Sequence, residues 1–317
     1  MNNIFLTGCT GFLGSHILYQ LCLNNTYNIY CVIRNNNNIS LFKNFPNNHK
    51  IRFIISDLDT PKKYRHILIR CHYVIHTASP VILKKLNKKD EFNLLINPAL
   101  NNIKNIFENV NPIIFKRFIF TSSVTAIYNK NKFCDEKDWN LNDLDSYSKS
   151  KLYSEIKCFE YVKNKPYDVV SINPSAFFGK DIIEKKSNNN KLIEKIIHNQ
   201  YHPFHVNFKM TFCDVRDVAK FHILSLNKNI KKGRYIVHNR TIDVKTLLEK
   251  CNKINPNIKL PLFYINPYIV NNFCSFFRIN VGELYSYLDY TPLFNNNKSK
   301  KYINYTNINS TLKKILL

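Results

Sequence analysis

The chain has 317 residues, of which 44% are hydrophobic, so it is long enough to bury one large core or two modest ones. Its 46 Lys and Arg residues against 22 Asp and Glu residues give a formal charge of +24. A basic excess of this size is compatible with nucleic acid, an acidic membrane surface or phosphorylated ligands. The lysines are scattered, however, and Asn-rich runs accompany them, which favours a compositional bias over a nucleic-acid footprint.

The nine cysteines are an odd number and show no Cys-x-x-Cys spacing, which argues against a disulfide framework and a zinc site. Most lie in apolar segments (Cys9, Cys31, Cys71, Cys158 and Cys213), as expected for buried free thiols in a reducing compartment. An apolar run begins three residues after Met1, which leaves no room for a cleaved presequence, and no run is long enough to span a bilayer. We therefore expect a soluble cytoplasmic protein without a metal site.

The first predicted strand, Ile4 to Thr7, leads into a glycine turn. Glycines at 8, 11 and 14 follow, and then an apolar-periodic helix runs to about Leu23. A turn of this kind between a strand and a helix is typical of dinucleotide binding. The first glycine permits the tight turn, the second lets the backbone approach a pyrophosphate, and the third lets the helix pack on the strand.

The second predicted strand, Ile29 to Ile33, ends at Arg34. In a doubly wound fold the residue at this position faces the adenine ribose, where an acidic side chain would accept from the ribose hydroxyls. An arginine suits a 2′-phosphate instead, so the sequence favours NADP over NAD. The alternative is an ordinary solvated arginine.

Two further strands are predicted before the middle of the chain, Arg52 to Ser56 and Tyr73 to His76. Asp57-Leu58 follows the first, where a carboxylate can meet the adenine amino group. Thr77-Ala78-Ser79 follows the second, where small residues let the chain pass close to a cofactor. His76 is interpreted as structural rather than catalytic.

A long helix is predicted over about Glu91 to Asn109, interrupted by Pro98. The fifth strand, Lys116 to Thr121, carries Ser122 and Ser123 at its carboxyl end. Because ligands bind outside the carboxyl ends of strands in open α/β sheets, a hydroxyl there is placed to touch substrate, although either serine could instead cap the next segment.

Tyr147 and Lys151 lie four residues apart on a predicted helix that runs to about Lys163, so they share one helix face. An ammonium near a phenol favours the phenolate and moves the pKa of the tyrosine toward the working range of a proton donor. The pair is weak evidence alone and gains weight because a dinucleotide turn and a serine stand upstream in the expected order.

The sixth predicted strand, Tyr167 to Ile172, is followed by less regular alternation. We predict a mobile loop around Lys185 to Asn190. A short strand and a helix start are predicted near Thr211 to Ala219, with Asp214 or Asp217 as the cap. The tail to Leu317 is predicted to be a small α-rich region.

Several of these motifs together resemble the extended short-chain dehydrogenase/reductases: Gly8-x-x-Gly11-x-x-Gly14, Ser123, Tyr147-x-x-x-Lys151 and Asn173-Pro174. Local stretches such as His76-Thr77-Ala78-Ser79-Pro80 and Tyr147-Ser148-Lys149-Ser150-Lys151 are similar to the branch of dihydroflavonol reductases, cinnamoyl-CoA reductases and aldehyde/ketone reductases. The resemblance covers residues 1 to about 225, and the departures, such as Asn102 in place of the usual glycine, leave the substrate open.

The resemblance implies an α/β, Rossmann-type doubly wound parallel sheet with a smaller, mainly α C-terminal lobe. Residues 1–175, with 205–240 returning to them, would form the NADP-binding domain, and 176–317 most of the substrate lobe. It implies reduction of an aldehyde or ketone with NADPH, in which Tyr147 is the general acid, Lys151 tunes it and Ser123 polarises the carbonyl. The residues expected to contact NADP(H) are Gly8, Thr10, Gly11, Phe12, Leu13, Gly14, Arg34, Asp57, Leu58, Thr77, Ala78, Ser79, Tyr147, Lys151 and Pro174.

Two alternatives stay open. A nucleotide-sugar epimerase or dehydratase would usually hold NAD and prefer an acidic residue in place of Arg34. A non-catalytic NADP-sensing or nucleic-acid-binding protein would commonly lose Tyr147 or Lys151, and both are present. A homodimer formed through paired helices is common in the superfamily and is a further expectation.

Overall fold

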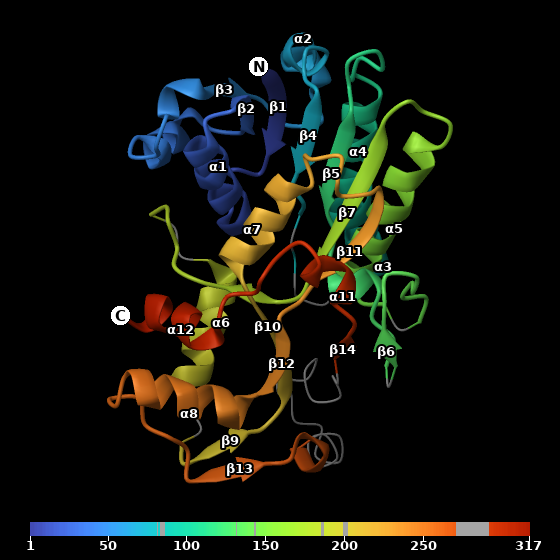
Figure 1. The fold of residues 1–317 in the computed structure, drawn as a ribbon. Helices are drawn as coiled ribbons and strands as arrows, with labels where there is room; N and C mark the ends of the chain where they lie inside the picture. Colours follow the sequence, from blue (N-terminus) through green and yellow to red (C-terminus); the bar gives the residue numbers. More distant parts are fainter. Residues whose placement is uncertain are drawn as a thin grey trace.

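The computed structural model describes residues 1–80, 82, 86–130, 132–142, 144–184, 187–198, 202–270 and 292–317. Its main feature is a seven-stranded sheet in the order β11-β7-β5-β4-β1-β2-β3, in which all pairs are parallel (Figure 1). The strands are β1 (Asn2–Thr7), β2 (Tyr27–Ile33), β3 (Ile51–Ile55), β4 (Tyr73–His76), β5 (Arg117–Thr121), β7 (Asp168–Pro174) and β11 (Gly233–Val237). The chain winds outward from β1 to β3 and then returns to β4, so the strand order reverses beside β1. The predicted Rossmann-type, doubly wound fold is confirmed.

Helices cover both faces of this sheet. Those on one face are α1 (Phe12–Asn24) and α7 (Val215–Leu224), and those on the other are α4 (Asn97–Phe107) and α5 (Ser146–Val162) (Figure 1). Ile4 and Leu6 of β1 pack in the core with α1 and α7, whereas Phe5 between them packs in the core with α4 and α5. Because both faces are buried, the strands contain runs of consecutive apolar residues, such as Ile4-Phe5-Leu6 and Phe118-Ile119-Phe120, rather than apolar residues at alternate positions only.

Short elements connect the main ones. They are the 3-10 turns η1 (Asn36–Phe42), η2 (Asn48–Lys50), η3 (Pro61–Lys63) and η5 (Val124–Ala126), the short helices α2 (Arg65–Leu68), α3 (Lys88–Glu91) and α11 (Asn297–Lys300), and the strand β6 (Phe133–Cys134), which pairs with β14 (Leu293–Phe294).

The helix predicted over Glu91 to Asn109 is continuous but changes its winding. A π-helical turn, η4 (Phe92–Ile96), lies between α3 and α4, and Pro98 stands in the first turn of α4. Proline has no N–H to donate, and the wider π turn removes the need for one, so Pro98 does not break the helix.

A smaller lobe follows β7 and holds a core of its own. Its helices are α6 (Asn188–Ile197), α8 (Val244–Ile254) and α12 (Ile308–Leu316). It also contains a three-stranded sheet of β8 (Phe177–Phe178), β10 (Lys209–Asp214) and β12 (Arg240–Asp243), and a two-stranded sheet of β9 (Phe204–Val206) and β13 (Phe263–Ile265). Helices therefore make up most of its regular structure, but only β10 among its strands was predicted. Asp214 is the side-chain cap of α7, and Asp217 lies within the helix.

The prediction of a mobile loop over Lys185 to Asn190 is wrong for its second half, while residues 185 and 186 lie outside the described residues. Ser187 caps α6, and Asn188 to Asn190 form the first turn of that helix. Asn190 is buried and its amide donates to the carbonyl oxygen of Gly179 at 2.6 Å and to Asp181 at 2.9 Å. An Asn-rich run reads as a loop by composition, but a serine cap and two amide hydrogen bonds stabilise a helix here.

All eight cysteines in the described residues are free and buried, so the predicted free thiols are confirmed for them; Cys274 lies outside. In the same part of the chain, no helix has the length and apolar character needed to cross a bilayer. Nor do the described residues contain a group of three or more His, Cys, Asp or Glu side chains arranged to hold a metal ion.

Three buried histidines predict a loss of stability in mild acid. Burial lowers the pKa of His76 to about 3 and those of His222 and His238 to about 4, so the folded protein resists their protonation. Unfolded histidines bind protons as the pH falls through about 6.5, and stability therefore decreases below that value, by about 1 kcal/mol for each histidine at about pH 5.5. We expect a clear fall in melting temperature, measured by circular dichroism, between about pH 7.5 and about pH 5.5. His222→Gln should reduce this pH dependence, and an unchanged dependence would contradict the assignment.

Candidate active site

The glycine turn between β1 and α1 allows the closest backbone packing at the sheet edge. Gly8 has φ +78°, and a Cβ there would lie 2.4 Å from the Thr77 hydroxyl and 2.7 Å from the Ala78 nitrogen. A Cβ on Gly14 would lie 2.0 Å from the carbonyl oxygen of Gly8. Gly8 thus lets the end of β1 lie against the segment after β4, and Gly14 lets α1 begin directly on the turn.

The first turn of α1 presents unpaired backbone N–H groups at the same edge. Gly11 is its N-cap, and the first turn contains no acidic side chain. Because the first N–H groups of a helix have no partner inside the helix, and because its N-terminus carries a partial positive charge, the amides of Phe12, Leu13 and Gly14 fit an anion such as a pyrophosphate.

The other residues predicted to contact a cofactor follow neighbouring strands at this edge. Arg34 follows β2 and Asp57 follows β3, and both are exposed, whereas Leu58 is buried and its carbonyl oxygen accepts from the Tyr64 hydroxyl at 2.8 Å. The segment Thr77-Ala78-Ser79 follows β4, and the Thr77 hydroxyl donates to the carbonyl oxygen of Thr7 at 2.8 Å. The remaining two are Thr10, in the glycine turn, and Pro174, the last residue of β7.

His76 takes a structural position, as interpreted from the sequence. It is the last residue of β4, it is buried, and its Nδ1 hydrogen-bonds the hydroxyl of Thr7 at 2.8 Å. That bond joins the ends of β1 and β4 at the point where the strand order reverses.

Ser123, Tyr147 and Lys151 meet beyond the end of β5. Ser123 follows this strand and is the N-cap of η5, where its oxygen accepts from the amide of Thr125 at 3.2 Å. It therefore both caps the segment and faces the helix α5, on which Tyr147 forms a side-chain hydrogen bond with it. Lys151, one turn further along α5, is buried and donates to the carbonyl oxygen of Thr121 at 3.0 Å, with its Nζ 5.8 Å from the centre of the Tyr147 ring.

Burial shifts the two ionisable groups in opposite directions. It raises the pKa of Tyr147 to about 12, although the hydrogen bond with Ser123 acts to lower it. It lowers the pKa of Lys151 to about 8, against the influence of Glu155, which raises it. The lowering of the Tyr147 pKa expected from Lys151 does not prevail in this geometry, because burial has the larger effect and the ammonium is directed to the Thr121 carbonyl rather than to the phenol. Tyr147 is therefore a protonated phenol at neutral pH, and Lys151 a cation close to its titration point.

Sequence reasoning missed the ion pair of Glu155 and Arg234, which lies behind this group. Glu155 is fully buried on α5, one turn beyond Lys151, and it forms an ion pair with the buried Arg234 of β11 at 2.8 Å. Asn173, noted only as part of the Asn173-Pro174 motif, donates to the same carboxylate. An acidic side chain on the buried face of a predicted helix was the available signal, since such a carboxylate needs a partner.

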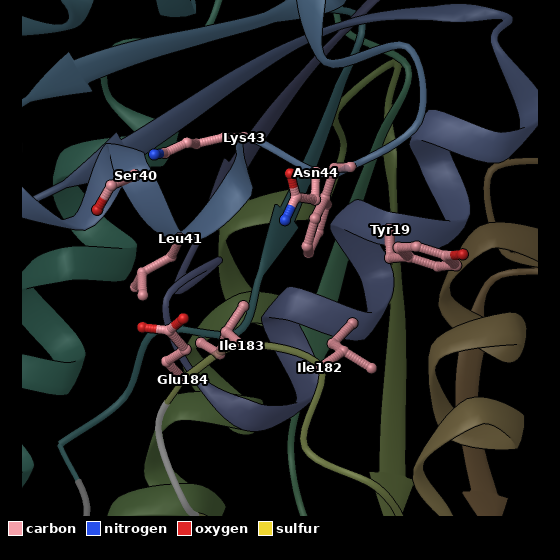
Figure 2. A pocket seen from close by; sticks show the side chains of 9 residues that line it. Tyr19, Ser40, Leu41, Lys43, Asn44, Ile182, Ile183 and Glu184 are labelled. Carbon is pink, nitrogen blue, oxygen red and sulfur yellow. The ribbon is translucent and has the colours of Figure 1, made fainter.

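A separate cavity of about 410 Å³ lies between α1, the η1 segment and residues 182–184 (Figure 2). Tyr19, Lys43 and Ile183 are among its lining side chains. None of the predicted site residues lines it, so we do not assign the reaction to it.

The sheet order, the glycine turn at the strand reversal and the adjoining Ser-Tyr-Lys group are those of the short-chain dehydrogenase/reductase class. More specifically, the chain belongs to the NAD dependent epimerase/dehydratase family, whose model matches residues 4–238. It is 29% identical over 251 residues to vestitone reductase of Medicago sativa, and the aligned region covers 73% of this chain and 75% of that protein. It is 25% identical over 290 residues to the NADPH-dependent methylglyoxal reductase of Saccharomyces cerevisiae, covering 81% and 84%.

The fold also matches a solved structure of the yeast methylglyoxal/isovaleraldehyde reductase in complex with NADPH. The TM-score is 0.78 at 22% identity, and the match covers 99% of this chain and 96% of that one. The family model and the relatives confirm the predicted resemblance to extended reductases, and the solved structure confirms the fold.

The geometry of the glycine turn predicts that alanine substitutions at Gly14 and Gly11 weaken dinucleotide binding to different extents. We expect Gly14→Ala to weaken dinucleotide binding at least about 100-fold, because its Cβ would overlap the Gly8 carbonyl at 2.0 Å. Gly11→Ala, whose Cβ would lie 3.2 Å from the same oxygen, should have a smaller effect. Titration of protein fluorescence with NADPH measures both, and equal affinities for the two variants would contradict this account of the turn.

Proposed function

We propose that the protein is an NADPH-dependent reductase that converts an aldehyde or ketone to an alcohol. The observation that supports this proposal is that Ser123, Tyr147 and Lys151 lie together at the carboxyl ends of the strands, where the glycine turn also lies. The names of the relatives, vestitone reductase and methylglyoxal reductase, support the same reaction class. The substrate is a small carbonyl compound.

The residues at the edge fit the cofactor. The free amides at the start of α1 suit the pyrophosphate, and Arg34, exposed at the end of β2, suits the 2′-phosphate of NADP. When bound, NADPH would supply the hydride for the reduction.

Side chains of the protein supply the proton for the reduction. Tyr147 is protonated at neutral pH and donates to the carbonyl oxygen as negative charge develops there, while Ser123 donates a second hydrogen bond to that oxygen. Lys151 keeps a positive charge behind the tyrosine and stabilises the phenolate that remains. The protonated form of Tyr147 is the form that reduction of a carbonyl requires.

The proposal also assigns the two parts of the chain. Residues 1–175 and 205–240 would bind the cofactor, and the rest of 176–317 would bind the substrate; β11 of the large sheet lies within the returning segment. A cytoplasmic location and a homodimer stay predictions from the sequence.

Removal of the Tyr147 hydroxyl tests the reaction. We expect Tyr147→Phe to bind NADPH with unchanged affinity and to lose turnover by about 10²- to 10⁴-fold, because the proton donor is gone. The measurement is the loss of NADPH absorbance with a panel of aldehydes and ketones. Wild-type turnover in the variant would refute the assigned role. No turnover by the wild type with any carbonyl, together with NAD that co-purifies, would favour the epimerase or dehydratase alternative.

Reversal of charge at Arg34 tests the cofactor. We expect Arg34→Asp to shift the ratio of NADPH to NADH affinities toward NADH by at least about tenfold, since a charge-assisted hydrogen bond contributes about 1.5 kcal/mol or more. Arg52→Asp is the matched control, because Arg52 lies near the start of β3 and away from the carboxyl ends of the strands. An unchanged preference in Arg34→Asp would mean that another side chain binds the 2′-phosphate.

A further inference from the structure

A buried carboxylate lies directly behind the proposed catalytic residues. Glu155 is fully buried and accepts hydrogen bonds from three side chains: from the Ser122 hydroxyl at 2.7 Å, from the Asn173 amide at 3.0 and 3.2 Å, and from Nε and Nη2 of Arg234 at 2.8 and 3.2 Å. Ser122 immediately precedes Ser123, and Asn173 also donates to the carbonyl oxygen of Ser123 at 3.1 Å. The backbone that carries the Ser123 hydroxyl is therefore held from two sides by groups bonded to Glu155.

Arg234 connects the same carboxylate to the segment that precedes α5. Its guanidinium donates to the carbonyl oxygen of Glu136 at 3.2 Å and to that of Asp138, and it lies 3.8 Å from the centre of the Trp139 ring. Asn140, next in the chain, donates through its amide to the carbonyl oxygen of Thr125 at 2.9 Å. One buried arginine thus joins β11, α5 and the segment 136–140 that packs on η5.

Glu155 also supplies a negative charge near Lys151. The ionisable groups around Lys151 are Tyr147, Glu155 and Cys158 on its own helix and His76 on β4. His76 is neutral at the pH of interest, because burial lowers its pKa to about 3, and burial raises the pKa of Cys158 well above its usual value. Glu155 is therefore the carboxylate that acts on Lys151, from one helical turn away on the same face of α5, and its charge is shared with Arg234.

We propose that the buried Glu155–Arg234 pair is a positioning device of the reductase site, which orients Ser123 and sets the pH at which Lys151 loses its proton. Both are positioning residues, because they act through Ser123 and Lys151 and do not touch the reacting atoms. This inference rests on the proposed function, but its electrostatic part can be measured without turnover.

Opposite charge changes in the pair should move the pH profile in opposite directions. Activity requires charged Lys151, so the wild-type kcat/KM should fall as the pH rises through about 8. This fall of kcat/KM at high pH is the alkaline limb of the pH profile. In Glu155→Gln the nearby anion is gone and the Lys151 ammonium is less stable, so the alkaline limb moves to lower pH by about one unit. In Arg234→Gln the anion loses its competing cation, which moves the limb to higher pH.

Glu160→Gln is the matched control, since it makes the same change on the exposed side of α5, where Glu160 pairs with Lys157. Its alkaline limb should coincide with that of the wild type. A merely structural role for the pair would lower kcat or the melting temperature in Glu155→Gln and leave the limb in place, and that result would overturn the proposal.

A single variant that leaves an unpaired buried charge can fail to fold. The double variant Glu155→Gln, Arg234→Gln then carries the test, because it removes both charges of the ion pair together. Its limb should still lie at lower pH than that of the wild type, since Glu155 rather than Arg234 is the group whose charge acts on Lys151. A limb at the wild-type position would refute the electrostatic role.

A readout without turnover separates this inference from the proposed function. In protein labelled with ¹³C at the lysine ε carbons, the signal that disappears in Lys151→Met belongs to Lys151, and its chemical shift follows the titration of that amine. The midpoint should move to lower pH in Glu155→Gln and stay in place in Glu160→Gln. If that shift is seen but no carbonyl compound is reduced, the proposed function fails and the coupling stands. If carbonyl reduction is seen but the midpoint does not move, the coupling fails and the function stands.

Discussion

All seven strands of the large sheet run parallel, and for this reason each strand delivers its last residue to the same edge. Segments far apart in the chain, such as the glycine turn after β1, Arg34 after β2 and Ser123 after β5, are thereby gathered along one line. The constraint has a second effect, because a parallel sheet needs helices on both faces to bury its side chains. One of those helices, α5, carries Tyr147 and Lys151 to the same edge.

Much of this arrangement could be predicted from the sequence, because its signals are local. Buried parallel strands are short apolar runs, a glycine turn has a fixed spacing, and two residues four apart on a helix share a face. Six of the seven strands of the large sheet were placed to within two residues at either end. The members of the Ser123, Tyr147 and Lys151 group could each be named for the same reason, because their order relative to the strands determines where they lie.

What could not be predicted depends on contacts between distant segments. Arg234 is 79 positions from Glu155, and no local pattern indicates that their side chains pair. The direction of the Tyr147 pKa was also missed, since spacing places the ammonium near the phenol but does not reveal that the Thr121 carbonyl binds it. The helix start at Asn188 was obscured by composition. In a chain with only six glycines, asparagine takes structural positions, and the three non-glycine residues with positive φ in the described part are Asn25, Asn47 and Asn164.

The C-terminal segment bears on the order in which the molecule can fold during synthesis. Asp214 caps α7 and also accepts from the buried Thr311 hydroxyl at 2.7 Å, while Asp217 accepts from the backbone and hydroxyl of Thr306 at 2.7 and 2.8 Å. Both aspartates lie at the start of α7, which packs on the large sheet. Their partners, Thr306 and Thr311, follow about ninety residues later in the chain. During synthesis, the two carboxylates at the start of α7 therefore lack these hydrogen bonds until Thr306 and Thr311 have been added to the chain.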